Sequence, residues 1–226
     1  SPNRLSSKPL STLLSRTPPP VDPALADSAV ELLDEAAVES IRQECLRYVE
    51  SGHVARVVPL VETLSGFGFP IKELGKPSDI VRMCIEKRDP EMAVRYVAAL
   101  TNERMLYCTI VNEFGKRRDL DSALIAYKAA MNKLATPNMY LCRTIIDVCG
   151  RCSDYMASRS VFEDLLNQEI IPNVYVVNSL VNVNAHDLGY IMPIYRNMKE
   201  LGVMPDVASY NILLKACSVA GRVDLA

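Results

Sequence analysis

A repeated junction is the feature of this sequence that most limits its fold. The segments TPNMYLCRTII, IPNVYVVNSLV and VMPDVASYNIL each place a proline and an Asn or Asp before an apolar run. Their prolines, Pro137, Pro172 and Pro205, are 35 and 33 residues apart. Proline ends a preceding helix, and the Asn or Asp that follows it can cap the next helix. A period near 35 residues therefore predicts a repeat architecture.

Alignment on these prolines divides the second part of the chain into repeats. The units are expected at 104–138, 139–173 and 174–206, with a partial unit at 207–226. Each complete unit is expected to contain two helices, at 105–115 and 119–132, 140–151 and 154–168, and 175–185 and 187–201. The third unit is two residues short, so we expect a tighter turn between its helices.

Glycines mark the turns between the two helices of a unit in this interpretation. Gly115, Gly150 and Gly221 are placed where a left-handed backbone is wanted. One such hairpin cannot bury its apolar faces alone, so neighbouring hairpins must stack. The sequence therefore predicts an all-α fold, an α-solenoid with a continuous core.

The first part of the chain lacks this regular period. Residues 22–103 show helical spacing of apolar residues, with glycines and prolines at intervals, and predict irregular helical hairpins. Residues 1–21 contain five prolines and several serines and basic residues. This composition predicts a disordered segment, which is either transit-peptide-like or a linker.

Composition and motifs exclude several classes of protein. No apolar run approaches the ~18 residues of a membrane span, so no membrane partner is expected. No phosphate-binding loop, HExxH or GxSxG motif occurs, so we predict no catalytic residues, no cofactor and no enzymatic activity. The net charge of −2 counts mildly against a nucleic-acid partner, although a basic groove can exist in a neutral chain.

Seven cysteines are scattered along the chain, as in an intracellular protein with reduced thiols. Cys149 and Cys152 form a CxxC pair, and Cys142 lies seven residues upstream. A zinc site would need further ligands, and both histidines are remote in sequence. We therefore expect these thiols to be packing residues at a helix end and predict no metal site.

The repeat units resemble the pentatricopeptide repeat. The resemblance lies in a helix–turn–helix unit of about 35 residues that opens on an aliphatic-Tyr-Asn pattern and ends in GVMPD, and it covers residues 104–226 well. The hairpins before residue 104 are at best degenerate members. The uninterrupted period resembles the pure class of the family. The resemblance implies a right-handed solenoid that binds single-stranded RNA in a plant organelle, the chloroplast rather than the mitochondrion, and acts in RNA processing, stability or translation.

The resemblance also assigns roles to positions within a unit. In the family, the fifth and last residues of a repeat together read one base, and the second residue packs against base faces. The implied base-reading pairs here are Cys108 with Asn138, Arg143 with Asn173, and Asn178 with Asp206, and Asn211 is the fifth residue of the partial unit. Only Asn178 with Asp206 matches a familiar combination, the one associated with uracil.

Stacking and phosphate contacts complete the implied RNA site. Tyr140 and Tyr175 occupy the second position, where a ring can stack on a base. Lys116 and Arg151 are equivalent cations that can contact phosphates. Each residue also has a structural interpretation: the last residues are helix N-caps, the tyrosines belong to the interface core, and the cations lie on a solvated turn.

Two functions from different classes follow. The first is RNA binding by a pentatricopeptide repeat array. The alternative is a scaffold of degenerate repeats that binds a protein partner or self-associates, which the acidic pI near 5.8 and the unusual Cys108 and Arg143 favour.

Overall fold

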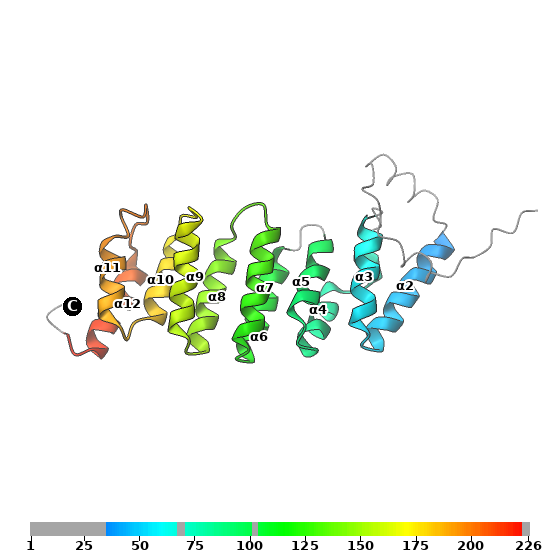
Figure 1. Cartoon of the computed structure of the whole chain (residues 1–226), viewed down its shortest axis with the longest axis horizontal. Coiled ribbons are helices and arrows are strands. Elements are labelled where there is room, and N and C mark those ends of the chain that lie inside the picture. The colour runs from blue at the N-terminus through cyan, green and yellow to red at the C-terminus, as the bar shows by residue number, and fades with distance from the viewer. Residues whose placement is uncertain (1–34, 67–70, 101–103, 223–226) are drawn as a thin grey trace, which may run out of the picture. The chain divides into compact units, whose positions relative to one another are not determined.

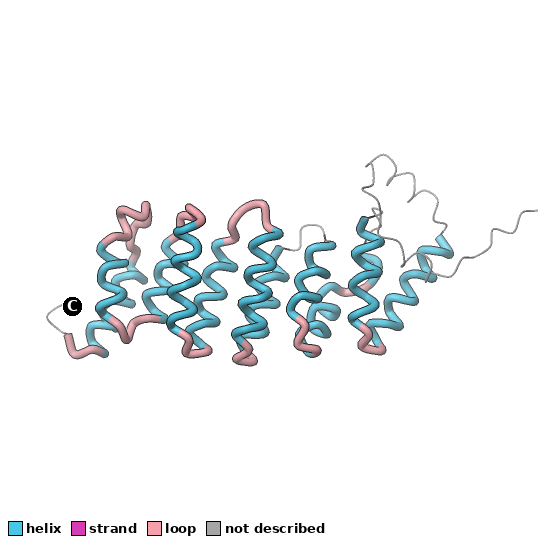
Figure 2. The backbone as a smooth tube through the Cα atoms, in the orientation of Figure 1, coloured by secondary structure: helices cyan, strands magenta, loops and turns pink. Residues whose placement is uncertain are grey.

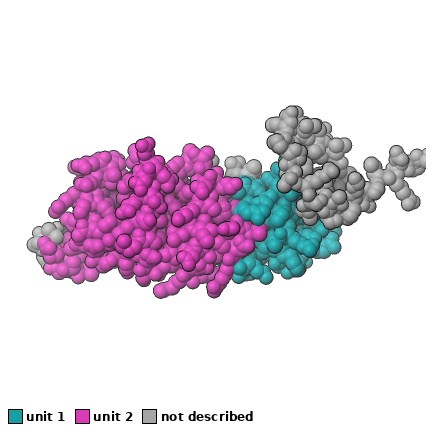
Figure 3. Space-filling model, in the orientation of Figure 1, with its two compact units in different colours: residues 1–87, 95–103 teal, residues 88–94, 104–226 magenta. Residues whose placement is uncertain are grey.

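The computed structural model describes residues 35–66, 71–100 and 104–222, which are helices joined by short connections (Figures 1 and 2). These ranges contain no strand. The segment at 1–21, predicted to be disordered, lies outside the described residues. The chain divides into two compact units (Figure 3). Unit 1 contains residues 1–87 and 95–103, and unit 2 contains residues 88–94 and 104–226.

Unit 1 is built from short helices around a small aliphatic core. Its described elements are α2 (Glu35–Glu50), α3 (Val54–Gly66), the 3-10 helix η2 (Ile71–Leu74), α4 (Pro77–Glu86) and the second half of α5 (Pro90–Ala99). Val57, Val58 and Val61 of α3 are completely buried. The guanidinium of Arg95 donates two hydrogen bonds to the carboxylate of Glu62, at 2.9 and 2.6 Å, and so ties α5 to α3.

In its described residues 104–222, unit 2 contains three consecutive helical hairpins and one further helix. The helices are α6 (Arg104–Lys116), α7 (Leu120–Lys133), α8 (Met139–Arg151), α9 (Tyr155–Asn167), α10 (Val174–Val183), α11 (Leu188–Arg196) and α12 (Val207–Val219). The first helices of the hairpins, α6, α8, α10 and α12, pack on one another in that order and form one layer. The second helices α7 and α9 each pack on the first helix of their own hairpin and on that of the next.

The same column of the repeat supplies the core between neighbouring first helices. Ile110, Ile145 and Leu180 are each the seventh residue of a unit, and all three are completely buried. Leu213 occupies this place in α12 and is also buried. Because each hairpin buries this column against its neighbours, the core is continuous through unit 2. The predicted all-α repeat fold is confirmed.

The turns between paired helices differ from the prediction. Gly115 and Gly150 lie inside α6 and α8, and the left-handed residues are Arg118 (φ 55°) and Ser153 (φ 61°), three positions later. Gly221 does have positive φ, 68°, and it occupies the same column as Arg118 and Ser153. The predicted turn role is therefore correct for Gly221 and wrong for Gly115 and Gly150.

The two helical glycines have a packing role instead. A Cβ atom at Gly150 would lie 2.6 Å from Cγ2 of Val183 in the next first helix. A Cβ atom at Gly115 would overlap the methyl groups of Val148 in the same way. Glycine at this column therefore lets successive first helices approach closely.

The first helix of the third hairpin is shorter than those of the other two, which accounts for the missing residues. The tighter turn that we expected is therefore absent. Helix α10 has 10 residues, whereas α6 and α8 have 13 each. Residues 184–187 then connect α10 to α11, and Arg159 of α9 holds this connection. Its Nε donates to Oδ1 of Asn184 and its Nη2 to Oδ2 of Asp187, both at 2.8 Å.

Candidate nucleic-acid interface

The last residue of each repeat unit caps the first helix of the next unit. The side-chain oxygens of Asn138, Asn173 and Asp206 accept hydrogen bonds from backbone N–H groups two or three residues ahead, at 2.8–3.2 Å. The structural role that we considered for these residues is therefore real.

Asp206 does more than cap, because it also holds Asn178 of its own unit. Nδ2 of Asn178 donates to Oδ1 of Asp206 at 3.0 Å. Oγ of Ser209 lies 2.7 Å from Oδ1 of Asn178 and 2.9 Å from Oδ1 of Asp206, so its single proton can serve either oxygen. Asn178 is only 8% exposed, and its amide is fixed in orientation by these contacts.

Hydrogen bonding also fixes the charge of this group. The backbone N–H of Ser209, followed by the amide of Asn178, lowers the pKa of the Asp206 carboxyl. Asp206 is thus an ionised group that can only accept hydrogen bonds at neutral pH. It therefore forces the amide of Asn178 to present its nitrogen rather than its oxygen on that side.

The other fifth-position residues have different chemistry. Cys108 is buried, and burial raises the pKa of its thiol to about 11, so it is a neutral and weak hydrogen-bonding group. The side chain of Arg143 is 47% exposed, and its Nε lies 3.6 Å from Oδ2 of Asp147. Asn211 in α12 is exposed. The fifth column therefore offers a thiol, a guanidinium and an amide in successive complete units.

The second-position residues lie on the surface. Tyr140 is 56% exposed and Tyr175 is 59% exposed, and Met105 in the same column is also exposed. The interpretation of these tyrosines as interface core is therefore wrong. Their rings are accessible for stacking.

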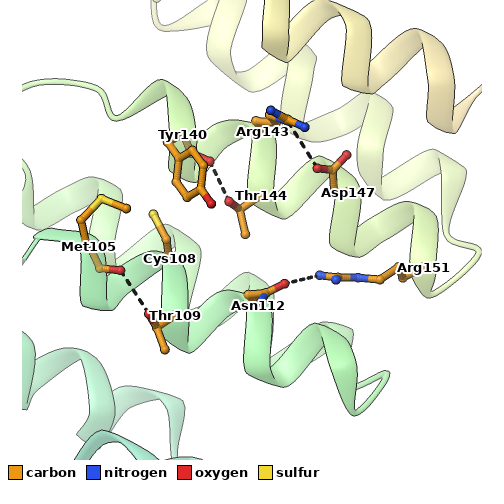
Figure 4. Close-up of a pocket in the computed structure, with 9 residues that line it drawn as sticks. All are labelled: Met105, Cys108, Thr109, Asn112, Tyr140, Arg143, Thr144, Asp147 and Arg151. Atoms are coloured by element: carbon orange, nitrogen blue, oxygen red, sulfur yellow. Dashed lines mark hydrogen bonds and ion pairs between the residues drawn. The ribbon is translucent and has the colours of Figure 1, made fainter. Parts of the chain in front are cut away.

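Two grooves run along the layer of first helices and bring these columns together. One groove of about 290 Å³ lies between α6 and α8 (Figure 4), and a second of about 310 Å³ is lined by α8, α10 and α12. Apart from Arg151, the residues of the complete units that line them come from the second, fifth, sixth and ninth columns: Met105, Cys108, Thr109, Asn112, Tyr140, Arg143, Thr144, Asp147, Tyr175, Asn178, Ser179 and Asn182.

The sixth and ninth columns were not found from the sequence. They follow from the second and fifth columns by the i, i+3, i+4, i+7 spacing of one helix face, which was the available signal. Asp147 accepts a hydrogen bond from the hydroxyl of Ser179 in the next unit. These columns therefore line the grooves and also join neighbouring repeats.

The two predicted phosphate-binding cations differ in their surroundings. Arg151 lines the first groove, where its Nη2 donates to Oδ1 of Asn112 at 2.8 Å (Figure 4). Lys116 is paired with Glu113 at 2.5 Å and is absent from the lining of both grooves. Arg151 is thus the better placed of the two.

The thiols near the CxxC pair belong largely to the core. Cys142 and Cys149 are completely buried, and burial raises the pKa of Cys149 to about 12. The hydroxyl of Tyr127 lies 3.9 Å from Sγ of Cys142. Among the described residues, no group of three or more His, Cys, Asp or Glu side chains could hold a metal ion. Over the same residues, every helix falls short of the length and apolar character that a membrane span requires.

Comparisons with known proteins identify the family. A family model for the pentatricopeptide repeat domain matches residues 160–219. A chloroplastic pentatricopeptide repeat-containing protein of Arabidopsis thaliana is 49% identical over 197 residues, which make up 87% of this chain. The chain belongs to the pentatricopeptide repeat family. It spans 23% of the length of that Arabidopsis relative.

A solved pentatricopeptide repeat structure shows the same fold. The crystal structure of the maize protein PPR10 matches over 95% of this chain and 31% of its own, with 16% identity and a TM-score of 0.53. A structure of PPR10 with an 18-nucleotide psaJ RNA element matches with 18% identity and a TM-score of 0.48 over 95% of this chain and 30% of that chain. The assignment to the pure class of the pentatricopeptide repeat family stays a prediction.

Proposed function

We propose that this chain binds single-stranded RNA along the two grooves of unit 2, as part of a pentatricopeptide repeat protein without enzymatic activity. The RNA-binding protein acts in RNA processing, stability or translation in a plant organelle. The chloroplast is supported by the name of the Arabidopsis relative, which is chloroplastic.

The observation that carries this proposal is the fixed amide of Asn178 in the lining of the second groove. A carboxamide has two N–H donors and two acceptor lone pairs. One N–H is used by Asp206 and one lone pair can be used by Ser209, which leaves one N–H donor and one acceptor lone pair of the amide for an RNA base.

The locked orientation fixes which end of the amide donates and which end accepts. Uracil and guanine present a carbonyl oxygen beside a ring N–H, whereas adenine and cytosine present the reverse order, an amino group beside a ring acceptor. Because Asp206 can only accept hydrogen bonds, the amide of Asn178 cannot flip to exchange its donor and acceptor ends. This supports the uracil specificity that the Asn178–Asp206 combination implies by its resemblance to the family.

The exposed rings and the groove cation supply the remaining contacts. Tyr140 and Tyr175 flank the successive base positions, and stacking on an aromatic ring contributes about 1–3 kcal/mol per base. Arg151 contacts the phosphate backbone from the edge of the first groove. Three complete units with one fixed base reader imply weak to moderate affinity for this chain alone, because ordering the RNA opposes binding.

The test is a titration of labelled short single-stranded RNAs by fluorescence anisotropy, at low and moderate salt, with a set that varies one position through all four bases. The wild type should prefer uracil at one position, and losing that contact should cost about 1–3 kcal/mol, the scale for a good base-edge pair. Replacing Asn178 by Ser together with Asp206 by Asn should move the preference toward adenine, by analogy with the family.

A second set of variants separates base reading from backbone contacts. Arg151→Ala should weaken binding to every RNA and flatten its salt dependence, and Lys116→Ala should do so to a smaller degree. Arg196→Ala, an exposed site on α11 in the layer of second helices, is the matched control and should change nothing. If the wild type binds no RNA, or the double replacement leaves base preference unmoved, Asn178 and Asp206 are structural residues and the protein-scaffold function takes precedence.

A further inference from the structure

Arg143 and Asp147 are the two residues that line both grooves of unit 2. Both lie on α8, one helical turn apart, with Nε of Arg143 3.6 Å from Oδ2 of Asp147 (Figure 4). Their side chains are 47% and 40% exposed. A base between the Tyr140 and Tyr175 positions would therefore present its edge to this pair.

We propose that Arg143 and Asp147 together form a guanine-reading site in the second repeat. This inference rests on the proposed RNA binding and adds a specificity that the pair of Arg143 with the last residue, Asn173, does not supply. Arg143 donates to guanine O6 and N7, and Asp147 accepts from N1–H and the exocyclic N2 amino group.

The donor and acceptor pattern singles out guanine among the four bases. Guanine has two adjacent acceptors, O6 and N7, that match the planar fork of a guanidinium. It also has two donors, N1–H and N2–H, that match the two oxygens of a carboxylate. Uracil offers only one donor to Asp147 and has no acceptor that corresponds to N7. Adenine and cytosine place an amino group opposite the guanidinium of Arg143, so two donors would face each other.

The neighbouring carboxylate argues against a phosphate site at Arg143. The pair has no net charge, and a phosphate within reach of the guanidinium would be repelled by Asp147. Asp147 is in turn held by the hydroxyl of Ser179, so its position does not depend on the ion pair alone. Arg151, whose groove partner is the neutral Asn112, lacks such an opposing charge in that contact.

The test uses short RNAs that contain the uracil expected to contact Asn178. One neighbouring base, either before or after this uracil, is varied. The wild-type chain should bind the guanine RNA about tenfold more tightly than the adenine or cytosine RNA, as expected for one well-made base contact. Replacing that guanine with inosine, which lacks the N2 amino group, should weaken wild-type binding. Replacing it with 7-deazaguanine should also weaken binding, because N7 is lost.

Conservative variants assign the contacts to the two side chains. Arg143→Lys keeps the charge but removes the fork, and should remove the response to 7-deazaguanine. Asp147→Asn keeps the size and can still accept from Ser179, and should remove the response to inosine. Arg196→Lys, the control outside the grooves, should leave every preference unchanged. Circular dichroism should be the same for all variants.

Two results would overturn the proposal. One is a wild-type chain that shows no guanine preference next to the uracil position. The other is an Arg143→Ala variant that weakens binding to all RNAs equally and flattens the salt dependence, which would make Arg143 a phosphate contact. A uracil preference from the Asn178 unit that persists in either case shows that only this inference has failed. Absence of all RNA binding would mean that the proposed function has failed as well.

Discussion

The close contact at Gly150 allows a sharp test of how the first helices pack. In the Gly150→Ala variant, the new Cβ would lie 2.6 Å from Cγ2 and 3.1 Å from Cγ1 of Val183. A β-branched valine in a helix has one strongly preferred rotamer, so its methyl groups cannot easily turn away. Helix α8 or α10 must therefore shift.

Two effects of opposite sign decide the magnitude. Alanine inside a helix is more favourable than glycine by about 1 kcal/mol. Forcing an extra methyl group into a well-packed contact costs about 1–3 kcal/mol. We expect the Gly150→Ala variant to lose about 1 kcal/mol of unfolding free energy.

In the Val183→Ala background, we expect the change in unfolding free energy caused by Gly150→Ala to have the opposite sign. Truncating Val183 removes both methyl groups and leaves only its Cβ, 3.4 Å from the new methyl, which is ordinary contact. In that background Gly150→Ala should raise stability by about 1 kcal/mol, the helix propensity term alone. Urea denaturation of the four proteins followed by circular dichroism measures this cycle. The same sign in both backgrounds would refute the assignment of Gly150 to close packing.

Two further predictions concern ionisation and thiol reactivity. Because hydrogen bonds from Ser209 lower the pKa of Asp206 in the folded protein, Asp206 stabilises the fold above its unfolded pKa, and this contribution is lost as pH falls through the folded value. As pH falls, the free energy of unfolding should therefore decrease less steeply for Asp206→Asn than for the wild type. Parallel curves of unfolding free energy against pH would contradict the assignment. Among three of the thiols, the native protein should react with a thiol reagent first at Cys152, which is partly exposed, and more slowly at Cys108 and Cys149, whose pKa values burial raises to about 11 and about 12. Mass spectrometry of the labelled peptides measures the order, and equal rates would show that the buried thiols are not protected by the fold.

The hairpin fold was predictable because three separate signals coincide in each unit. The proline, the Asn or Asp beside it, and the apolar seventh residue recur together at one period. Ile145 and Leu180 are good examples, since their burial follows from that register alone. The capping role of Asn173 was likewise predictable from residue type and position.

The turn and groove residues were harder to predict because they depend on distances between helices. Gly150 was assigned to a turn because glycine tolerates positive φ, but Ser153 takes that conformation and Gly150 faces Val183. Sequence shows that a residue is small without showing what lies beside it. The link from Asn178 to Ser209 spans 31 positions and required the helices to be placed.

The double duty of Asp206 limits how such a protein can change its target. In the proposed function, a residue at this place orients the base reader of its own repeat and must also start the first helix of the next repeat. Only side chains that cap helices well, chiefly Asp, Asn, Ser and Thr, satisfy the second demand. Folding therefore restricts which residues can occur at this position. A mutation that changes the base read by one repeat also alters the start of the first helix of the next repeat.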